Sequence, residues 1–333
     1  MSGRVNLLSA LLALQLVIIA AVLLVETGFG ESEQGPFLSF EADEVDELRI
    51  TGDGDDPTTL VLSRSEDGWH LPDGLPADAN KVRDVLDRLE GLRAPWPVAT
   101  SGGAAERFEV TSDNFQRHVV LTAGGDTVAD LYLGTSPGYQ QVHARRADDS
   151  AVYSVGISNY QVPVAVDDWL DKTLLQPQGA ITAVERPGVW RLTRAEEGWQ
   201  LGDAAADQEA ARELVRRLSE LRVTGVAEAP GEGTEPSARL VVTDEAGSYQ
   251  LALFAGGEGN PYQVRSDRRD GVFSLAVYLA EQILVERGAL VAGEKPSGPS
   301  DDAAPAGEAP ANGAPAPGEE GEPAPENAAE PGT

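Results

Sequence analysis

Residues 62–71 read LSRSEDGWHL, and residues 192–201 read LTRAEEGWQL. Leucine, arginine, glutamate, glycine and tryptophan recur at the same places in both stretches. In each stretch, alternating apolar residues flank a polar tip that ends in Gly-Trp, which is typical of two short antiparallel strands joined by a turn. The sequence therefore predicts the same hairpin twice, with Gly68, Trp69, Gly198 and Trp199 as its marks.

A second matched pair follows each hairpin. Residues 77–93 read ADANKVRDVLDRLEGLR, and residues 206–222 read ADQEAARELVRRLSELR. Two linked matches in the same order indicate a duplicated structural unit. Asp78 and Asp207 stand where a carboxylate accepts hydrogen bonds from the free N–H groups of a helix start, so we expect them to be helix caps. Apolar residues at helical spacing then predict one buried face on each helix: Val82, Val85, Leu86, Leu89 and Leu92, and Ala211, Leu214, Val215, Leu218 and Leu221.

Strand-like runs follow each predicted helix. Strands, then a helix, then more strands is an α+β order, so we expect each repeat to be an antiparallel sheet packed with an amphipathic helix. Tyr139 and Tyr262, ahead of the matching VYSV and VFSL, extend the correspondence, and an amphipathic segment closes each repeat. The strand-like runs are residues 118–122, 129–134 and 152–155, and residues 239–243, 249–254 and 272–275.

Residues 7–25 predict a transmembrane anchor. They read LLSALLALQLVIIAAVLLV, in which only Ser9 and Gln15 are polar, and about 20 apolar residues span a bilayer as a helix. Arg4 precedes this run and acidic residues follow it, so the positive-inside rule places the N-terminus in the cytoplasm. We expect a single-pass protein of the bacterial inner membrane that contacts membrane lipid through residues 7–25, with a periplasmic or extracytoplasmic body.

A cleaved signal peptide is the alternative interpretation of this segment. Its apolar region is usually about 7 to 15 residues long and ends at an Ala-x-Ala-like site, and the flank VETGFGE offers no good site.

The other end of the chain, residues 293–333, consists largely of Pro, Ala, Gly and Glu, which predicts a disordered acidic tail. The expected organisation is thus residues 1–30 as stub and anchor, 31–178 and 179–292 as the two repeats, and 293–333 as the tail.

Charge and composition exclude several classes of function. The chain has 25 Lys and Arg against 55 Asp and Glu, a formal net charge of -30 that repels nucleic acid. It has no cysteine, which excludes disulfides and thiolate chemistry. His70, His118 and His143 show no metal-ligand spacing, and no hydrolase, phosphate-loop or zinc-protease motif is present. We expect no catalytic, cofactor-binding or metal-binding residues.

The chain resembles the bacterial family labelled domain of unknown function 4340 over about residues 45–291. Members of that family are envelope proteins often encoded near ABC-type exporters, so the resemblance implies a transport partner rather than a reaction. The family implies no catalytic residues, and the long acidic tail departs from a plain member. The residues that carry the resemblance are Gly68, Trp69, Ala77, Asp78, Leu89, Leu92, Leu133, Gly134, Val152 and Tyr153.

Three functional hypotheses follow from the sequence. The first is a non-enzymatic accessory subunit of an ABC-type transport or envelope assembly complex. The second is an envelope hydrolase that uses Asp and Glu residues in a groove between the repeats. The third is a structural spacer that binds cell wall through its tail. Trp69 and Trp199 could form a ligand shelf, but a Trp beside a turn favours core packing, so we expect both to be buried.

Overall fold

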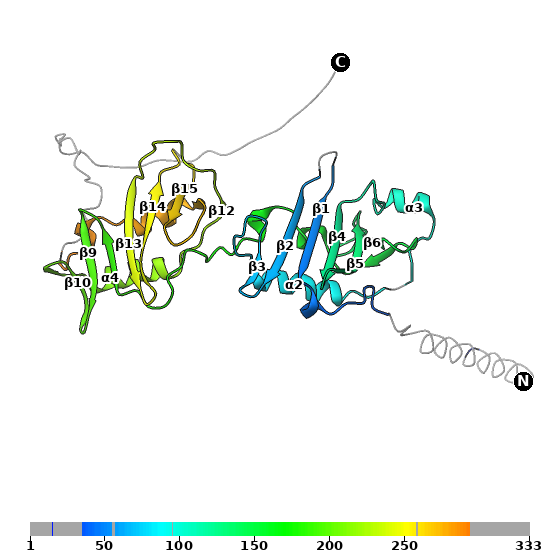
Figure 1. The fold of residues 1–333 in the computed structure, drawn as a ribbon, viewed down its shortest axis with the longest axis horizontal. Coiled ribbons are helices and arrows are strands. Elements are labelled where there is room, and N and C mark those ends of the chain that lie inside the picture. Colours follow the sequence, from blue (N-terminus) through cyan, green and yellow to red (C-terminus); the bar gives the residue numbers. More distant parts are fainter. Residues whose placement is uncertain (1–14, 16–34, 55–56, 95, 258, 294–333) are drawn as a thin grey trace, which may run out of the picture. The chain divides into compact units, whose positions relative to one another are not determined.

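The computed structural model contains a mixed α+β body with two antiparallel sheets (Figure 1). The predicted anchor, apart from Gln15, and the tail beyond Gly293 lie outside the described residues. Within the described residues, no helix has both the length and the apolar character needed to cross a membrane. The structure describes residues 15, 35–54, 57–94, 96–257 and 259–293.

The first unit, residues 35–178, contains the sheet with strand order β3-β2-β1-β4-β5-β6-β7. Its strands are β1 (Glu47–Gly52), β2 (Thr59–Ser65), β3 (Gly68–His70), β4 (Arg117–Ala123), β5 (Asp126–Leu133), β6 (Val142–Arg146) and β7 (Tyr153–Val155). Its helices are α2 (Ala79–Glu90), α3 (Gly102–Arg107) and the 3-10 turns η1 (Ala42–Glu44), η2 (Asn159–Gln161) and η3 (Val166–Asp168).

The second unit, residues 179–293, contains the sheet with strand order β11-β10-β9-β8-β13-β14-β15-β16-β12. Its strands are β8 (Ala183–Arg186), β9 (Trp190–Ala195), β10 (Gly198–Leu201), β11 (Ala204–Ala205), β12 (Gly225–Val226), β13 (Ala238–Asp244), β14 (Gly247–Phe254), β15 (Tyr262–Ser266) and β16 (Phe273–Leu275). Its helices are α4 (Gln208–Ser219), α5 (Val277–Ile283) and the 3-10 turn η4 (Arg287–Leu290).

The two sheets share one strand order. The run β10-β9-β8-β13-β14-β15-β16 has the same connectivity as β3-β2-β1-β4-β5-β6-β7, and the second sheet adds β11 and β12 at its two edges. The pairing register also agrees, because Trp69 lies opposite Arg64 and Trp199 lies opposite Arg194. Residues that match in sequence therefore occupy matching positions in the two ladders.

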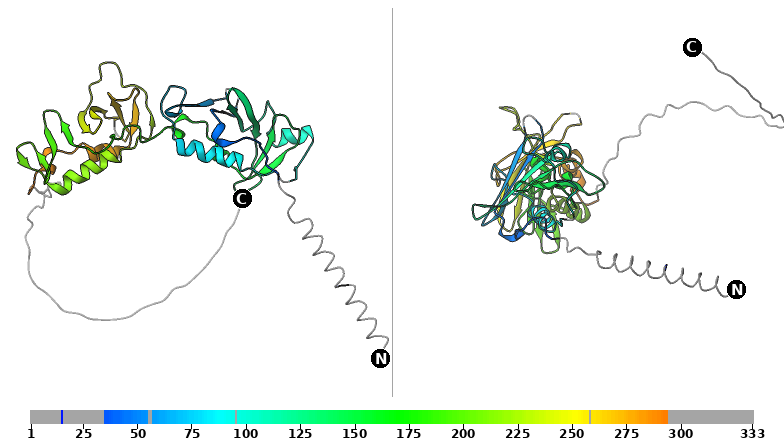
Figure 2. Two further views of the ribbon diagram at one scale, coloured as in Figure 1. Left: turned by 60° about the horizontal axis from the view of Figure 1, so that its bottom comes forward. Right: turned by 90° about the vertical axis from the view of Figure 1, so that its right-hand side faces the viewer.

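One face of each sheet packs against its helix. Leu48 pairs with both Leu62 and Leu121, and all three are fully buried. α2 lies along this face of the first sheet, and α4 lies along the corresponding face of the second (Figure 2). Each sheet is held to its helix by burial of these alternating apolar residues against the apolar face of the helix. The predicted helix faces are buried, except that Val215 is half-buried.

Two details differ from the expectation. Tyr139 and Tyr262 do not occupy equivalent positions, since Tyr262 begins β15 whereas Tyr139 is 90% exposed in the loop before β6. The register assigns Val142 to the position of Tyr262, because Ala144 and Val264 are the matching partners of Tyr153 and Phe273. Six strands that the sequence did not predict also complete the two sheets: β1, β6, β8, β11, β12 and β15.

Candidate functional site

The glycine and tryptophan marks of the two hairpins serve the fold. Gly68 and Gly198 have φ values of 127° and 136°, a conformation that residues with a Cβ rarely adopt. Trp69 and Trp199 are 8% and 7% exposed. Both tryptophan side chains therefore lie in a core and do not form an exposed surface for a ligand.

The two aspartate marks are N-caps. The Asp78 carboxylate accepts hydrogen bonds of 3.0 and 3.2 Å from the backbone N–H groups of Asn80 and Lys81. The Asp207 carboxylate accepts bonds of 2.9 and 3.0 Å from the N–H groups two and three residues further along. These bonds satisfy donors that a helix start leaves without partners. The six residues marked by the sequence thus form two separate structural sets, one at each hairpin and helix start.

An N-terminal arm, residues 35–45, is fixed onto the first unit. The Phe37 backbone N–H donates to the Leu92 carbonyl oxygen at 2.9 Å, and the Ala94 N–H donates to the Gly35 carbonyl oxygen at 3.1 Å. The Phe37 ring is buried and meets the Tyr153 ring edge-on at 5.5 Å. The arm is therefore part of the folded body from its first described residues.

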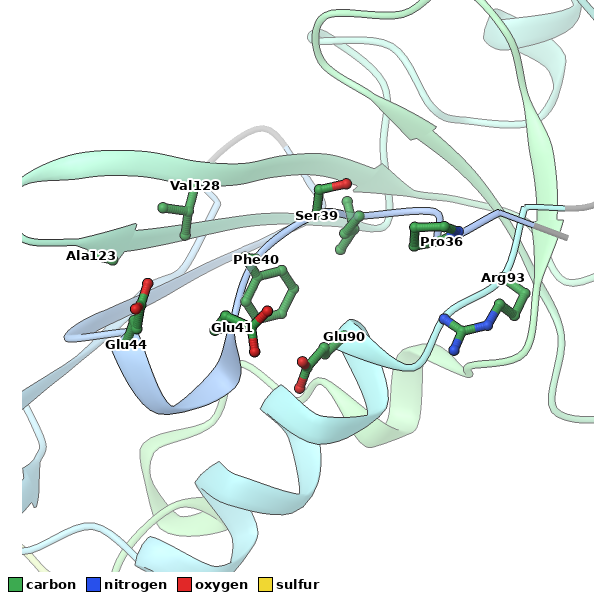
Figure 3. Close-up of a pocket in the computed structure, with 10 residues that line it drawn as sticks. Pro36, Ser39, Phe40, Glu41, Glu44, Glu90, Arg93, Ala123 and Val128 are labelled. Atoms are coloured by element: carbon green, nitrogen blue, oxygen red, sulfur yellow. The ribbon is translucent and has the colours of Figure 1, made fainter. Parts of the chain in front are cut away.

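A cavity of about 610 Å³ lies between this arm, the end of α2 and the β4–β5 hairpin (Figure 3). Glu41, Glu44 and Glu90 line it together with Arg93, around an apolar wall that includes Phe40. Three carboxylates against one guanidinium favour a cationic group over an anionic one. Sequence reasoning missed this cavity because its lining comes from three distant segments.

The outer face of the first sheet carries a cluster of titratable side chains. His118 Nε2 lies 2.7 Å from Asp130 Oδ1, and the His118 ring stacks on Tyr132 with 4.4 Å between centroids. The Arg145 guanidinium lies 4.9 Å from the Tyr132 ring centroid. Strand pairing accounts for the grouping, since His118 and Arg145 both lie opposite Tyr132. Burial raises the pKa of the Tyr132 hydroxyl.

The segment between α2 and β4 covers part of this face. Its Phe108 ring stacks on His143 at 4.0 Å, and His143 Nδ1 lies 2.9 Å from Thr135 Oγ1. Burial lowers the pKa of His143, which favours the neutral imidazole. Gly134 permits this close approach, because a Cβ there would overlap the carbonyl oxygens of Phe108 and Glu109.

The profile of the family described as Domain of unknown function (DUF4340) matches residues 69–240. The chain belongs to this family. The match begins at Trp69 of the first hairpin and ends at Leu240 in β13. No curated protein and no solved structure is similar enough to the chain to count as a match.

Two residues that carried the family resemblance have physical roles in this DUF4340 protein. Ala77 forms a bridge with Leu170, which joins the start of α2 to the end of the first unit. Gly134 allows the segment before β4 to cross the strand end. These roles concern folding, and they assign no reaction to the family.

The structure does not bring the three histidines of this DUF4340 protein together. His118 and His143 lie on the outer face of the first sheet, whereas His70 in β3 lies near Ser65 and Asp67. Among the residues that the structure describes, no group of three or more His, Asp or Glu side chains is arranged to hold a metal ion.

A second groove, of about 870 Å³, runs between the C-terminal half of α2 and the end of β7. Asp84, Asp87 and Arg88 of the helix line one side, and Ser154 of the strand lines the other. This groove adjoins a sheet edge, so backbone groups as well as side chains are available to a bound molecule. The position of this groove could not be inferred from the sequence, because the sequence predicted the strand at residues 152–155 but not that it lies at the edge of the sheet.

Proposed function

We propose that the chain is a non-enzymatic accessory subunit of an ABC-type transport or envelope assembly complex at the bacterial inner membrane. The fixed N-terminal arm is the observation that carries this proposal. The body is folded from Gly35 onward, and residues 26–34 reach at most about 30 Å when extended. With residues 7–25 in the bilayer, the first unit is held close to the membrane surface, where transporter subunits have their periplasmic parts.

Exposed aromatic side chains support an interaction role. Trp96, Tyr139 and Tyr160 are 80%, 90% and 94% exposed. Trp and Tyr are enriched among the residues that dominate binding energy at protein interfaces, because they bury large areas with few rotatable bonds. All three belong to the first unit, which is the unit next to the predicted anchor.

Copurification tests the proposal. The tagged full chain, expressed at native abundance and extracted in mild detergent, is expected to bring down transporter subunits in fixed proportion. A variant with Tyr139→Ala and Tyr160→Ala should lose most of this association, whereas Tyr278→Ala, at an exposed position of the second unit, should keep it. Recovery of the unmodified chain alone would contradict the proposal.

A further inference from the structure

The last strand of the first sheet has an open edge that its counterpart lacks. β7 is terminal in its sheet, whereas the equivalent strand β16 is followed by β12. β12 pairs with β16 through Gly225 opposite Ser274 and Val226 opposite Phe273. Among the strands that the structure describes, none lies beside β7 in the place of β12.

The two edges begin with one shared bond, and in the first unit Val152 also forms a bridge with Ala99. The Val98 backbone N–H donates to the Val152 carbonyl oxygen at 2.8 Å, and the Ala227 N–H donates to the Val272 carbonyl oxygen at the same distance. Each donor stands at the same place after its helix, so the chain approaches both strands in one way. The difference arises in the residues between the helix and this shared bond.

Those residues decide which edge is covered. In the second unit they read Thr224-Gly225-Val226, and the Thr224 N–H donates to the Ser274 carbonyl oxygen at 2.8 Å. In the first unit the corresponding residues read Pro95-Trp96-Pro97. Proline has no N–H, so Pro95 cannot donate to the Ser154 carbonyl oxygen as Thr224 donates to Ser274. The first unit therefore cannot cover its edge in the way the second does.

The backbone of Ser154 faces this open side. Ser154 lies opposite His143, whose N–H donates to Thr135 and whose carbonyl accepts from Gly134, both at 2.9 Å. His143 thus bonds away from β7, which makes its pairing with Ser154 a non-hydrogen-bonded one. The N–H and C=O of Ser154 then point away from β6. In the described part of the chain, no backbone group bonds to them on that side.

The surroundings of this edge suit an extended peptide. Ser154 lines the groove of about 870 Å³, which has the α2 surface as its other wall. At the start of the edge, Trp96 is 80% exposed and Val98 is 48% exposed. A strand added to β7 would gain backbone bonds from the outward N–H and C=O of Ser154 and place alternate side chains against α2 and Trp96.

We propose that the open edge of β7 is the docking site for an extended basic segment of a partner protein, which adds a strand to the first sheet. The groove itself is balanced, with Asp84 and Asp87 against Arg88 and Arg93. The whole chain carries a formal charge of -30, which attracts basic segments and repels acidic ones, a second copy of this chain among them. The proposal deepens the accessory-subunit role and rests on it for its biological setting.

A defined probe tests the proposal on the full chain in detergent. The probe is a synthetic peptide of alternating lysine and valine, about seven residues long, a usual strand length. It is expected to slow hydrogen exchange at the Ser154 amide by about tenfold or more, since exchange then requires release of a bound strand. A glutamate and valine peptide of the same length, and a lysine and valine peptide N-methylated at alternate residues, are expected to have no such effect.

Two variants of the edge sharpen the test. Ser154→Pro removes the outward N–H without removing a bond to β6, so it should abolish probe binding, and Ser154→Ala, which keeps that N–H, should bind as the original chain does. The triple variant Pro95→Thr, Trp96→Gly and Pro97→Val introduces into the first unit the residues found at 224–226 of the second, and it should therefore cover the edge. It is expected to fold normally, to protect positions 153–156 without the probe, and to show no further protection there when the probe is added.

Four outcomes would overturn the proposal. They are a slowly exchanging Ser154 amide in the free chain, equal binding of the acidic peptide, probe protection that the triple variant retains, and dimerisation through positions 153–156 in place of probe binding. Copurification with transporter subunits is measured separately. If the probe does not bind but transporter subunits still copurify, only the docking site at β7 is refuted. If the probe binds but no subunits copurify, the accessory-subunit role is refuted.

Discussion

The backbone N–H of Asp78 donates a hydrogen bond of 2.7 Å to the carbonyl oxygen of Trp169. The residue that caps α2 is thereby joined to the segment that closes the first unit. In the second unit the Asp207 N–H donates to the Leu290 carbonyl oxygen at 2.9 Å. Each helix start is therefore fixed twice, by its own carboxylate cap and by a backbone bond to the end of its unit. The same aspartate thus makes a local contact and a long-range one.

Truncation of either hairpin tryptophan is expected to destabilise the protein. Trp69→Ala and Trp199→Ala each leave a cavity in a packed core, so each should lower the free energy of unfolding by about 3 to 5 kcal/mol. Urea unfolding followed by circular dichroism measures this. Trp96→Ala, at an 80% exposed position, should change it by less than about 0.5 kcal/mol. A small effect at only one of the two buried positions would contradict their equivalence.

Loss of either cap should weaken its helix start. Asp78→Ala and Asp207→Ala each remove an acceptor for two backbone N–H groups, at an expected cost of about 1 kcal/mol. Asp78→Asn and Asp207→Asn keep a capping oxygen and should cost less. Thermal unfolding compares the four variants. If both alanine variants kept the original stability, the carboxylate bonds would contribute nothing to it.

Gly134→Ala is expected to displace the segment that covers the outer face of the first sheet. The new Cβ would overlap the Phe108 carbonyl oxygen, and overpacking of this kind costs about 1 to 3 kcal/mol. Hydrogen exchange should become faster in α3, while α4 keeps its original rate. Gly138→Ala, which meets no atom within 4 Å, is the matched control. Unchanged exchange in α3 would show that the backbone yields without strain.

Acid is expected to weaken the second unit through Asp244. The fully buried Asp244 carboxylate accepts bonds of 2.7 and 3.1 Å from Arg268, which hold its pKa at about 2, below the ordinary 3.8. Because the folded pKa is lowered, the stabilisation is complete above pH 3.8 and is lost as pH falls toward about 2. The shift corresponds to about 2 kcal/mol.

Urea unfolding between pH 5 and pH 2 tests this dependence. Asp244→Asn removes the titrating group, so this variant should be less stable at pH 5 and should lose less stability than the original chain below pH 3.8. Glu245→Gln, next to Asp244 in sequence, serves as the control and should keep the original pH profile. An unaltered profile in Asp244→Asn would assign the acid sensitivity to other carboxylates.

Local patterns predicted the parts of this fold that depend on few residues. The hairpins followed from alternation and a Gly-Trp turn, and the caps followed from Asp78 and Asp207 ahead of an apolar helical stripe. The strands β6 and β15 escaped prediction because each is short and carries polar residues among its apolar ones. β1 alternates regularly in burial, so a period of two could have revealed it.

The sequence by itself determined the α+β order and the positions of both caps, because hydrophobic spacing and capping chemistry act within a few residues. Only the tertiary structure decided that His118, Asp130 and Arg145 gather around Tyr132, and that Ser154 faces an open edge. Both results depend on strand order and register, which join residues far apart in the chain. Pro95 and Pro97 are visible in the sequence, but their consequence emerges only when β7 is seen at the edge that β12 covers in the other sheet.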